Sequence, residues 1–209
     1  MARSFTDAVR WTHEGTKLFL DASDGLTEAE YEAPSLLPGW TRKHLVAHVA
    51  ANAEALGNLL HWAATGEETP MYASPEERAA GIERGPQMSA AELTAWVNRS
   101  ATALRTAMDE LTDGQWQTEV VTAQGRTVPA TEVPWMRSRE VLVHAVDLGL
   151  GVTFADLPGD FLQALITDIT AKRKMDAATV PDGPLPEVAA WLAGRPHTLP
   201  DAPPLGPWL

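Results

Sequence analysis

The stretch Thr41-Arg-Lys-His-Leu-Val-Ala-His-Val-Ala-Ala-Asn-Ala-Glu-Ala-Leu-Gly-Asn-Leu-Leu60 carries the clearest structural signal in the chain. Its apolar residues recur every three or four positions, which is the repeat of a helix with one buried face. Thr41 suits the N-cap position, and we expect the helix to reach about Ala64. Such a helix must bury its stripe against other helices. The stripe consists of Leu45, Val49, Leu56, Leu59 and Leu60.

Three further segments show the same helical repeat. Ser4-Phe-Thr-Asp7 has the pattern of a capping box, and Ser89 and Thr131 stand where helices should begin. Residues 65–88 are rich in glycine, proline and charge, which indicates a loop with one short helix near residues 75–83. The segment 119–128 predicts two short strands around a Gln124-Gly125 turn. We therefore expect a mainly α fold, a four-helix bundle with a short β-hairpin before the last bundle helix.

The remaining residues differ in character from the bundle. A helix is expected from about Pro158 to Met175, followed by a proline-rich stretch, a short helical piece at residues 185–194 and an irregular tail. We expect a helical bundle at residues 1–151 and a small C-terminal lobe, a helix plus proline-rich tail, at residues 152–209.

Composition excludes several classes of function. The net charge of -12 would repel nucleic acid. No run of 18 apolar residues indicates a membrane span, and the N-terminus lacks the apolar core of a signal peptide, so we expect a cytoplasmic protein with no membrane contact. Cysteine is absent, so any thiol chemistry would need a thiol from outside the chain.

Three polar positions on the apolar stripes suggest a metal site. His48 lies within the stripe of the second helix, and Glu140 and His144 are four residues apart on the last bundle helix, so their side chains share one face. Buried polar groups of this kind need partners. Three nitrogen and oxygen ligands with an open position are typical of catalytic zinc.

Each of these residues also has an ordinary structural interpretation. His48 could be a core histidine bonded to a carbonyl or to Asn52, and Glu140 could pair with Arg137 or Arg139. The Glu-x-x-x-His spacing alone occurs by chance in many helices. His44, one turn before His48, competes for the ligand role but lies nearer the edge of the stripe.

Other polar residues could support this set. Asn52 and Asp147 could orient ligands from outside the coordination shell, although a structural role for Asp147 is slightly favoured. An anionic substrate would need a cationic clamp, for which Arg78, Arg84 and Arg195 are candidates beside the ordinary alternative of solvated surface charge. Without paired spacing, surface or packing roles are expected for His13, His61 and His197.

Two long motifs resemble a known family. The first motif is Leu37-Pro-Gly-Trp-Thr-Arg-Lys-His-Leu-Val-Ala-His48. The second is Pro134-Trp-Met-Arg-Ser-Arg-Glu-Val-Leu-Val-His-Ala-Val-Asp-Leu-Gly149. They resemble the second and fourth helices of the mycothiol-dependent maleylpyruvate isomerases. Met71-Tyr72 with Arg78, and Trp191-Leu-Ala-Gly-Arg195, are also similar to that family. The family belongs to the DinB-like metal-binding bundles, and the resemblance covers nearly the whole chain.

The resemblance implies a reaction and a set of roles. It places zinc ligands on His48, Glu140 and His144, and substrate-side arginines on Arg78 and Arg195. The implied reaction is the cis–trans isomerisation of maleylpyruvate to fumarylpyruvate in gentisate breakdown. A thiolate adds to the conjugated alkene, the resulting single bond rotates, and the thiolate leaves. Zinc would favour the thiolate form of mycothiol, which supplies the sulfur.

Two alternatives stay open at this stage. A mycothiol S-transferase would use the same metal and thiol to conjugate an electrophile. A non-catalytic bundle with a structural metal or none would act through a partner. For the isomerase, the expected partners are a small anionic substrate and a low-molecular-weight thiol, with the protein a monomer or homodimer.

Overall fold

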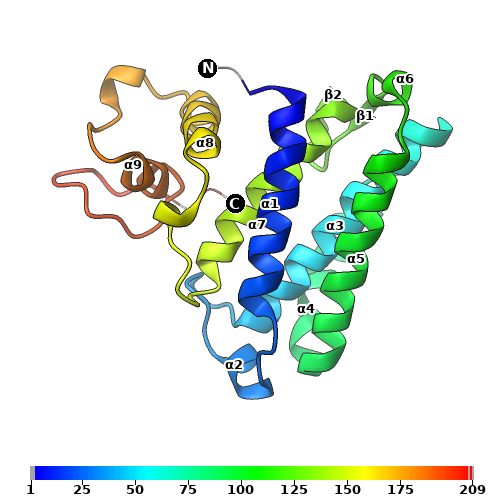
Figure 1. Cartoon of the computed structure of the whole chain (residues 1–209), viewed down its shortest axis with the longest axis horizontal. Helices are drawn as coiled ribbons and strands as arrows, with labels where there is room; N and C mark the ends of the chain where they lie inside the picture. Colours follow the sequence, from blue (N-terminus) through cyan, green and yellow to red (C-terminus); the bar gives the residue numbers. More distant parts are fainter. Residues whose placement is uncertain (1–2, 207, 209) are drawn as a thin grey trace.

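The computed structural model describes residues 3–206 and residue 208, without the side chains of Pro75, Arg78 and Ala177. Four long helices form the bundle, with α1 and α5 on one face and α7 and α3 behind them (Figure 1). Within the described residues no helix is both long and apolar enough to cross a membrane. The bundle helices are α1 (Phe5–Ser23), α3 (Arg42–Thr65), α5 (Ala90–Glu110) and α7 (Val133–Asp147).

The ends of these helices follow local signals in the sequence. Ser4 accepts a hydrogen bond from the Asp7 amide, and the Asp7 carboxylate accepts one in return from the Ser4 amide, which confirms the predicted capping box. Helix α3 ends where Gly66 adopts a left-handed conformation with φ of 79°. The predicted limits of α3 are therefore correct to within one residue.

Short elements complete the bundle. The predicted hairpin is present as β1 (Glu119–Val121) and β2 (Thr127–Pro129), paired antiparallel in a two-stranded sheet. Helix α4 (Pro75–Glu83) lies at the predicted place. Helices α2 (Glu28–Glu32) and α6 (Asp113–Trp116) were not predicted, because one turn of helix is too short to show an apolar period.

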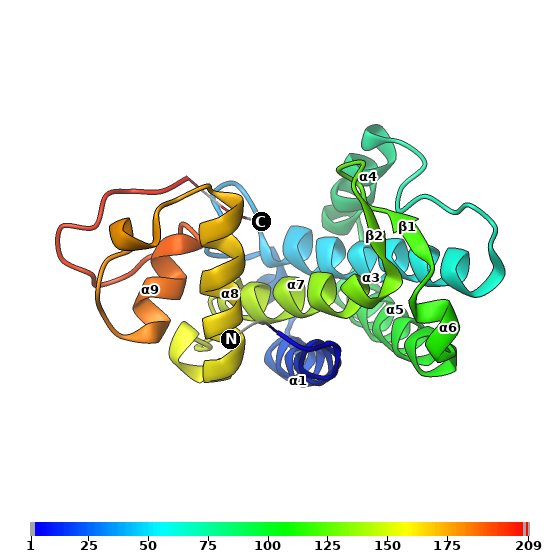
Figure 2. The same cartoon turned by 90° about the horizontal axis from the view of Figure 1, so that it is seen from above.

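The C-terminal segment packs beside α1 and α7 (Figure 2). It contains α8 (Gly159–Lys172) and α9 (Leu185–Leu192), with 3-10 turns at Phe154–Asp156 and Ala177–Thr179. Trp11 of α1, Trp135 of α7 and Phe161 of α8 have ring centroids 5.8 Å apart in each pair. One apolar cluster thus joins the lobe to the bundle, and the boundary at residues 151/152 stays a prediction.

Close packing between α1 and α7 depends on one glycine. A Cβ placed on Gly15 would lie 2.6 Å from Leu142 Cγ and 2.7 Å from Val141 Cγ2. Because a real methyl group cannot approach so closely, α1 sits directly against this face of α7 only with glycine there. Val141 and Leu142 therefore face α1.

We expect Gly15→Ala to lower the free energy of unfolding by about 1–3 kcal/mol, because the added methyl group overpacks the α1–α7 contact. Gly57→Ala in α3 is the matched control. A Cβ there meets nothing within 4 Å, so the higher helix propensity of alanine should stabilise by up to about 1 kcal/mol. Urea unfolding of both variants measures the difference, and equal effects would contradict a tight α1–α7 contact.

Candidate metal centre

Helices α3 and α7 bring the three predicted metal ligands together. One ligand atom from each of His48, Glu140 and His144 lies within 4.8 Å of the other two. The Nε2 atom of His48 is 2.9 Å from Glu140 Oε2, and the Nε2 atom of His144 is 3.2 Å from the same oxygen. The two imidazole rings stand nearly perpendicular, with centroids 5.1 Å apart.

The helical repeat explains this arrangement. Val141 and Leu142 point toward α1. Successive residues of a helix are rotated by about 100° around its axis, so another face of α7 turns toward α3. Glu140 and His144, one turn apart, therefore share the face of α7 that meets His48. His48 and His144 are 7% and 1% exposed, whereas the Glu140 side chain retains 15% exposure. All three side chains are thus largely removed from solvent.

Contacts within the cluster oppose the effect of burial on the pKa of Glu140 and of His144. Burial alone would raise the pKa of Glu140, but the contacts from His144 and His48 outweigh it and hold that pKa well below its usual value. Burial would lower the pKa of His144, yet the carboxylates of Asp147 and Glu140 raise it. Protons and a cation would therefore compete for the same nitrogen and oxygen atoms.

A buried ion pair stands behind His144. Its Nδ1 lies 2.8 Å from Asp147 Oδ2, and Asp147 is fully buried. The Asp147 carboxylate also accepts two hydrogen bonds from Arg195, from Nε at 3.0 Å and from Nη2 at 2.8 Å. Arg195 donates from Nη1 to the Ala193 carbonyl. These contacts engage every guanidinium nitrogen of Arg195.

The donor set fits a divalent metal ion. With Nδ1 of His144 donating to Asp147, the lone pair of His144 lies on Nε2. That Nε2 is buried and lies 3.2 Å from Glu140 Oε2 without forming a well-aligned hydrogen bond. A cation between the two atoms would give both of them a partner. Two imidazoles and one carboxylate are ligands that zinc accepts, with room for a fourth.

Arg137 occupies the next turn of the same face. It is 1% exposed and donates from Nη1 to the Val49 carbonyl and to Asn52 Oδ1. Burial lowers its pKa to about 10, with the charge of Glu140 acting in the opposite direction. Among the described residues it forms no ion pair within 4 Å, so the expected alternative of a Glu140–Arg137 salt bridge is wrong. Asn52, an expected partner of the ligands, binds Arg137 instead.

His44, the competing ligand, is engaged elsewhere. The Thr41 amide donates to its Nδ1 at 3.2 Å, so His44 belongs to the start of α3. Trp40, which sequence reasoning did not single out, lies beside both histidines, with its ring centroid 6.3 Å from that of His44 and 5.5 Å from that of His48. Its place directly before the N-cap of α3 is the signal that could have indicated it.

The other candidate residues are dispersed. The guanidinium of Arg84 lies 5.9 Å from the Trp96 ring. Arg78 belongs to α4, but its side chain is outside the described residues. His197 accepts a hydrogen bond from the Leu199 amide. His13 and His61 are exposed.

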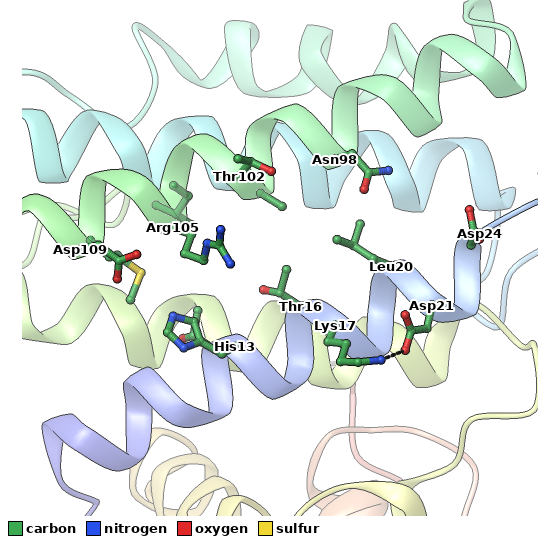
Figure 3. A pocket seen from close by; sticks show the side chains of 14 residues that line it. His13, Thr16, Lys17, Leu20, Asp21, Asp24, Asn98, Thr102, Arg105 and Asp109 are labelled. Atoms are coloured by element: carbon green, nitrogen blue, oxygen red, sulfur yellow. Dashed lines mark hydrogen bonds and ion pairs between the residues drawn. The ribbon is translucent and has the colours of Figure 1, made fainter.

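A separate groove of about 700 Å³ lies between α1 and α5 (Figure 3). His13, Thr16 and Lys17 line it from α1, and Thr102 and Arg105 from α5. None of the three clustered ligands contributes to it. Its rim carries both acidic and basic side chains, so it has no consistent charge for an anion or a cation. The metal cluster between α3 and α7 is therefore the better candidate for chemistry.

Asp147→Asn should lower the free energy of unfolding of the metal-free protein by about 3–5 kcal/mol at neutral pH, because Arg195 would be left buried without its anion. Although burial alone would raise the pKa of Asp147, His144 and Arg195 lower it. Its contribution is therefore present above the ordinary value of about 4 and is lost as the pH falls through the lowered pKa.

Urea unfolding between pH 7 and pH 3 tests this expectation. The gap between wild type and Asp147→Asn should narrow in acid, whereas exposed Asp182→Asn should follow the wild type throughout. A gap that is absent at pH 7 would contradict a stabilising ion pair.

Comparisons with known proteins show the family of the chain. Residues 12–149 match the family model for the mycothiol maleylpyruvate isomerase N-terminal domain. A crystal structure of the mycothiol-dependent maleylpyruvate isomerase is similar at a TM-score of 0.90 and 37% identity, over 99% of this chain and 98% of that one. A variant of it with a histidine-to-alanine substitution gives the same values. Comparison with curated proteins gives no match. The chain belongs to the mycothiol maleylpyruvate isomerase family.

Proposed function

We propose that this protein isomerises maleylpyruvate to fumarylpyruvate with mycothiol as the thiol cofactor. The observation that carries the proposal is the His48–Glu140–His144 cluster in a chain of this family. The similarity extends over nearly the full length of a solved isomerase at 37% identity, which supports a shared reaction. A cytoplasmic location follows from the proposal, because the thiol would have to be available to the enzyme.

We further propose that the three clustered residues hold zinc. His48 Nε2, Glu140 and His144 Nε2 would be the ligands, because these atoms lie within reach of one ion. A bound divalent ion would keep a thiol in its thiolate form at neutral pH. Imidazole and carboxylate ligands suit zinc, although ligand type alone does not exclude neighbouring metals.

The chemistry needs positive charge around the substrate. A cis double bond rotates only when its bond order falls, and reversible addition of a thiolate to the conjugated alkene moves the π electrons onto a carbonyl oxygen. The buried charge of Arg137, one turn from Glu140, favours this developing negative charge. Trp40 beside His48 narrows access for water on that side. Anionic carboxylates of the substrate would be attracted to the same region.

We assign Arg78 to a carboxylate of the substrate. Helix α4 packs closely on α3, since a Cβ on Gly81 would be 3.7 Å from Ala51 Cβ, and Gly85 approaches Ala47 more tightly still. Ala47 and Ala51 flank His48 in sequence. Arg78, one turn before Gly81, therefore starts from backbone close to the ligand-bearing part of α3. An arginine fork suits the planar carboxylate.

His48→Ala should reduce isomerisation by about 100- to 1,000-fold, because a ligand is lost from the proposed metal site and removal of one electrostatic stabiliser has an effect on this scale. The assay uses zinc-loaded protein with maleylpyruvate, with and without mycothiol, and follows formation of fumarylpyruvate. His61→Ala, an exposed histidine near the end of the same helix, is the control and should retain activity. Removal of zinc by a chelator should abolish turnover reversibly.

The outcome also separates the alternatives. Mycothiol-dependent conjugation of electrophiles without turnover of maleylpyruvate would favour an S-transferase. Full activity of His48→Ala would contradict the proposed metal site. Absence of any thiol-dependent reaction despite bound zinc would favour a non-catalytic bundle.

Arg78→Ala should raise the KM for maleylpyruvate about tenfold or more with a smaller effect on kcat, because a charged hydrogen bond to a substrate carboxylate is lost. Arg105→Ala in α5 is the control. Arg105 makes no hydrogen bond or ion pair within the described part of the chain and lies in the α1–α5 groove (Figure 3). Equal KM values for the two variants would contradict a substrate contact by Arg78.

A further inference from the structure

Arg195 of the C-terminal lobe binds the Asp147 carboxylate, which in turn contacts His144 of the proposed metal site. Arg195 follows α9, and its amide donates to the Ala190 carbonyl while its Nη1 donates to the Ala193 carbonyl. Gly194 adopts φ of 69°, which turns the chain at the end of α9. The side chain is 4% exposed. Its guanidinium is therefore held firmly by the lobe itself.

The Asp147 carboxylate contacts both His144 of the bundle and Arg195 of the C-terminal lobe. Its Oδ2 atom is 2.8 Å from His144 Nδ1 and 2.8 Å from Arg195 Nη2, and its Oδ1 accepts from Arg195 Nε at 3.0 Å. A bidentate arginine fixes the plane of a carboxylate. The plane of Asp147 in turn fixes the His144 ring, because a single hydrogen bond at Nδ1 sets both its tautomer and its orientation.

Among the described residues, few other polar contacts between the lobe and the bundle are as deeply buried. Arg139 of α7 pairs with Asp168 of α8 at 3.3 Å, and Arg10 of α1 with Asp160 of α8 at 2.5 Å, but neither pair touches a clustered ligand. The Arg195–Asp147 pair is buried on both sides and contacts His144 directly. Docking of the lobe and orientation of His144 thus depend on the same carboxylate.

We propose that Arg195 is a positioning residue, and that docking of the C-terminal lobe and metal binding at His144 are thermodynamically coupled through Asp147. The inference rests on the proposed metal site. It replaces the direct substrate contact that the family resemblance implied for Arg195, since the guanidinium is engaged by Asp147 and the Ala193 carbonyl. By linkage, a docked lobe strengthens metal binding and bound metal tightens the lobe by the same factor.

Zinc affinity of purified full-length variants, measured by competition with a chromogenic chelator, tests the first half. Arg195→Met should weaken zinc binding about 10–100-fold, the usual effect of losing an outer partner of a metal ligand. Arg195→Lys keeps the charge without the fork and should recover part of the loss. Arg173→Met is the control, because Arg173 binds the carbonyls of Leu192 and Gly206 within the lobe and should leave affinity within about twofold.

Hydrogen exchange tests the second half and does not depend on a variant folding. In the wild-type protein, zinc should slow amide exchange in α9, which contributes no metal ligand, and Arg195→Met should abolish that response. Unchanged α9 exchange on zinc addition, or equal zinc affinity in wild type, Arg195→Met and Arg173→Met, would overturn the coupling alone. Failure of the wild-type protein to bind zinc would overturn the proposed metal site together with it.

Discussion

The burial of charged side chains along α7 is the constraint on which the rest of the structure depends. This helix packs against α1 on one side and α3 on another, and the C-terminal lobe covers part of the remainder. Arg137, His144 and Asp147 are each at most 1% exposed. Since an unpaired buried charge costs several kcal/mol, each needs a partner. His144 has Asp147 on α7 itself, whereas Arg137 and Asp147 also bind groups of neighbouring elements. The need for these partners therefore fixes where the neighbouring elements pack against α7.

The partners outside α7 come from two parts of the chain. Helix α3 supplies Asn52 for Arg137 and His48 for Glu140, while the segment after α9 supplies Arg195 for Asp147. Apolar packing determines that helices associate, but it is tolerant of small shifts. Hydrogen bonds with defined geometry are less tolerant, so they specify the register of α7 against α3 and the seating of the lobe. The site and the fold therefore depend on the same contacts.

The sequence allowed much of this arrangement to be predicted, and the limits have physical reasons. The apolar period placed α3 and its N-cap, and the four-residue spacing placed Glu140 and His144 on one face. The partner of Asp147 lies 48 residues away in a different lobe, which no local pattern encodes. His44 and His48 share a stripe, and only the Thr41 amide distinguishes the helix cap from the ligand. Whether Arg78 meets a substrate depends on a side chain whose direction the sequence does not specify.

Charge balance links the buried network to the proposed chemistry. Arg137 and Arg195 offset Glu140 and Asp147, so with neutral imidazoles the cluster as a whole carries no net charge. A divalent cation bound to it would leave a double positive charge in a poorly solvated region, where electrostatic interactions are strong. Such a centre favours two anionic groups close together. A thiolate and a substrate carboxylate are two such groups, and the chain itself carries no cysteine to supply the first. With such a cation bound, a protein of net charge -12 would attract an anionic substrate at this cluster, because the local field there would oppose that of the surface.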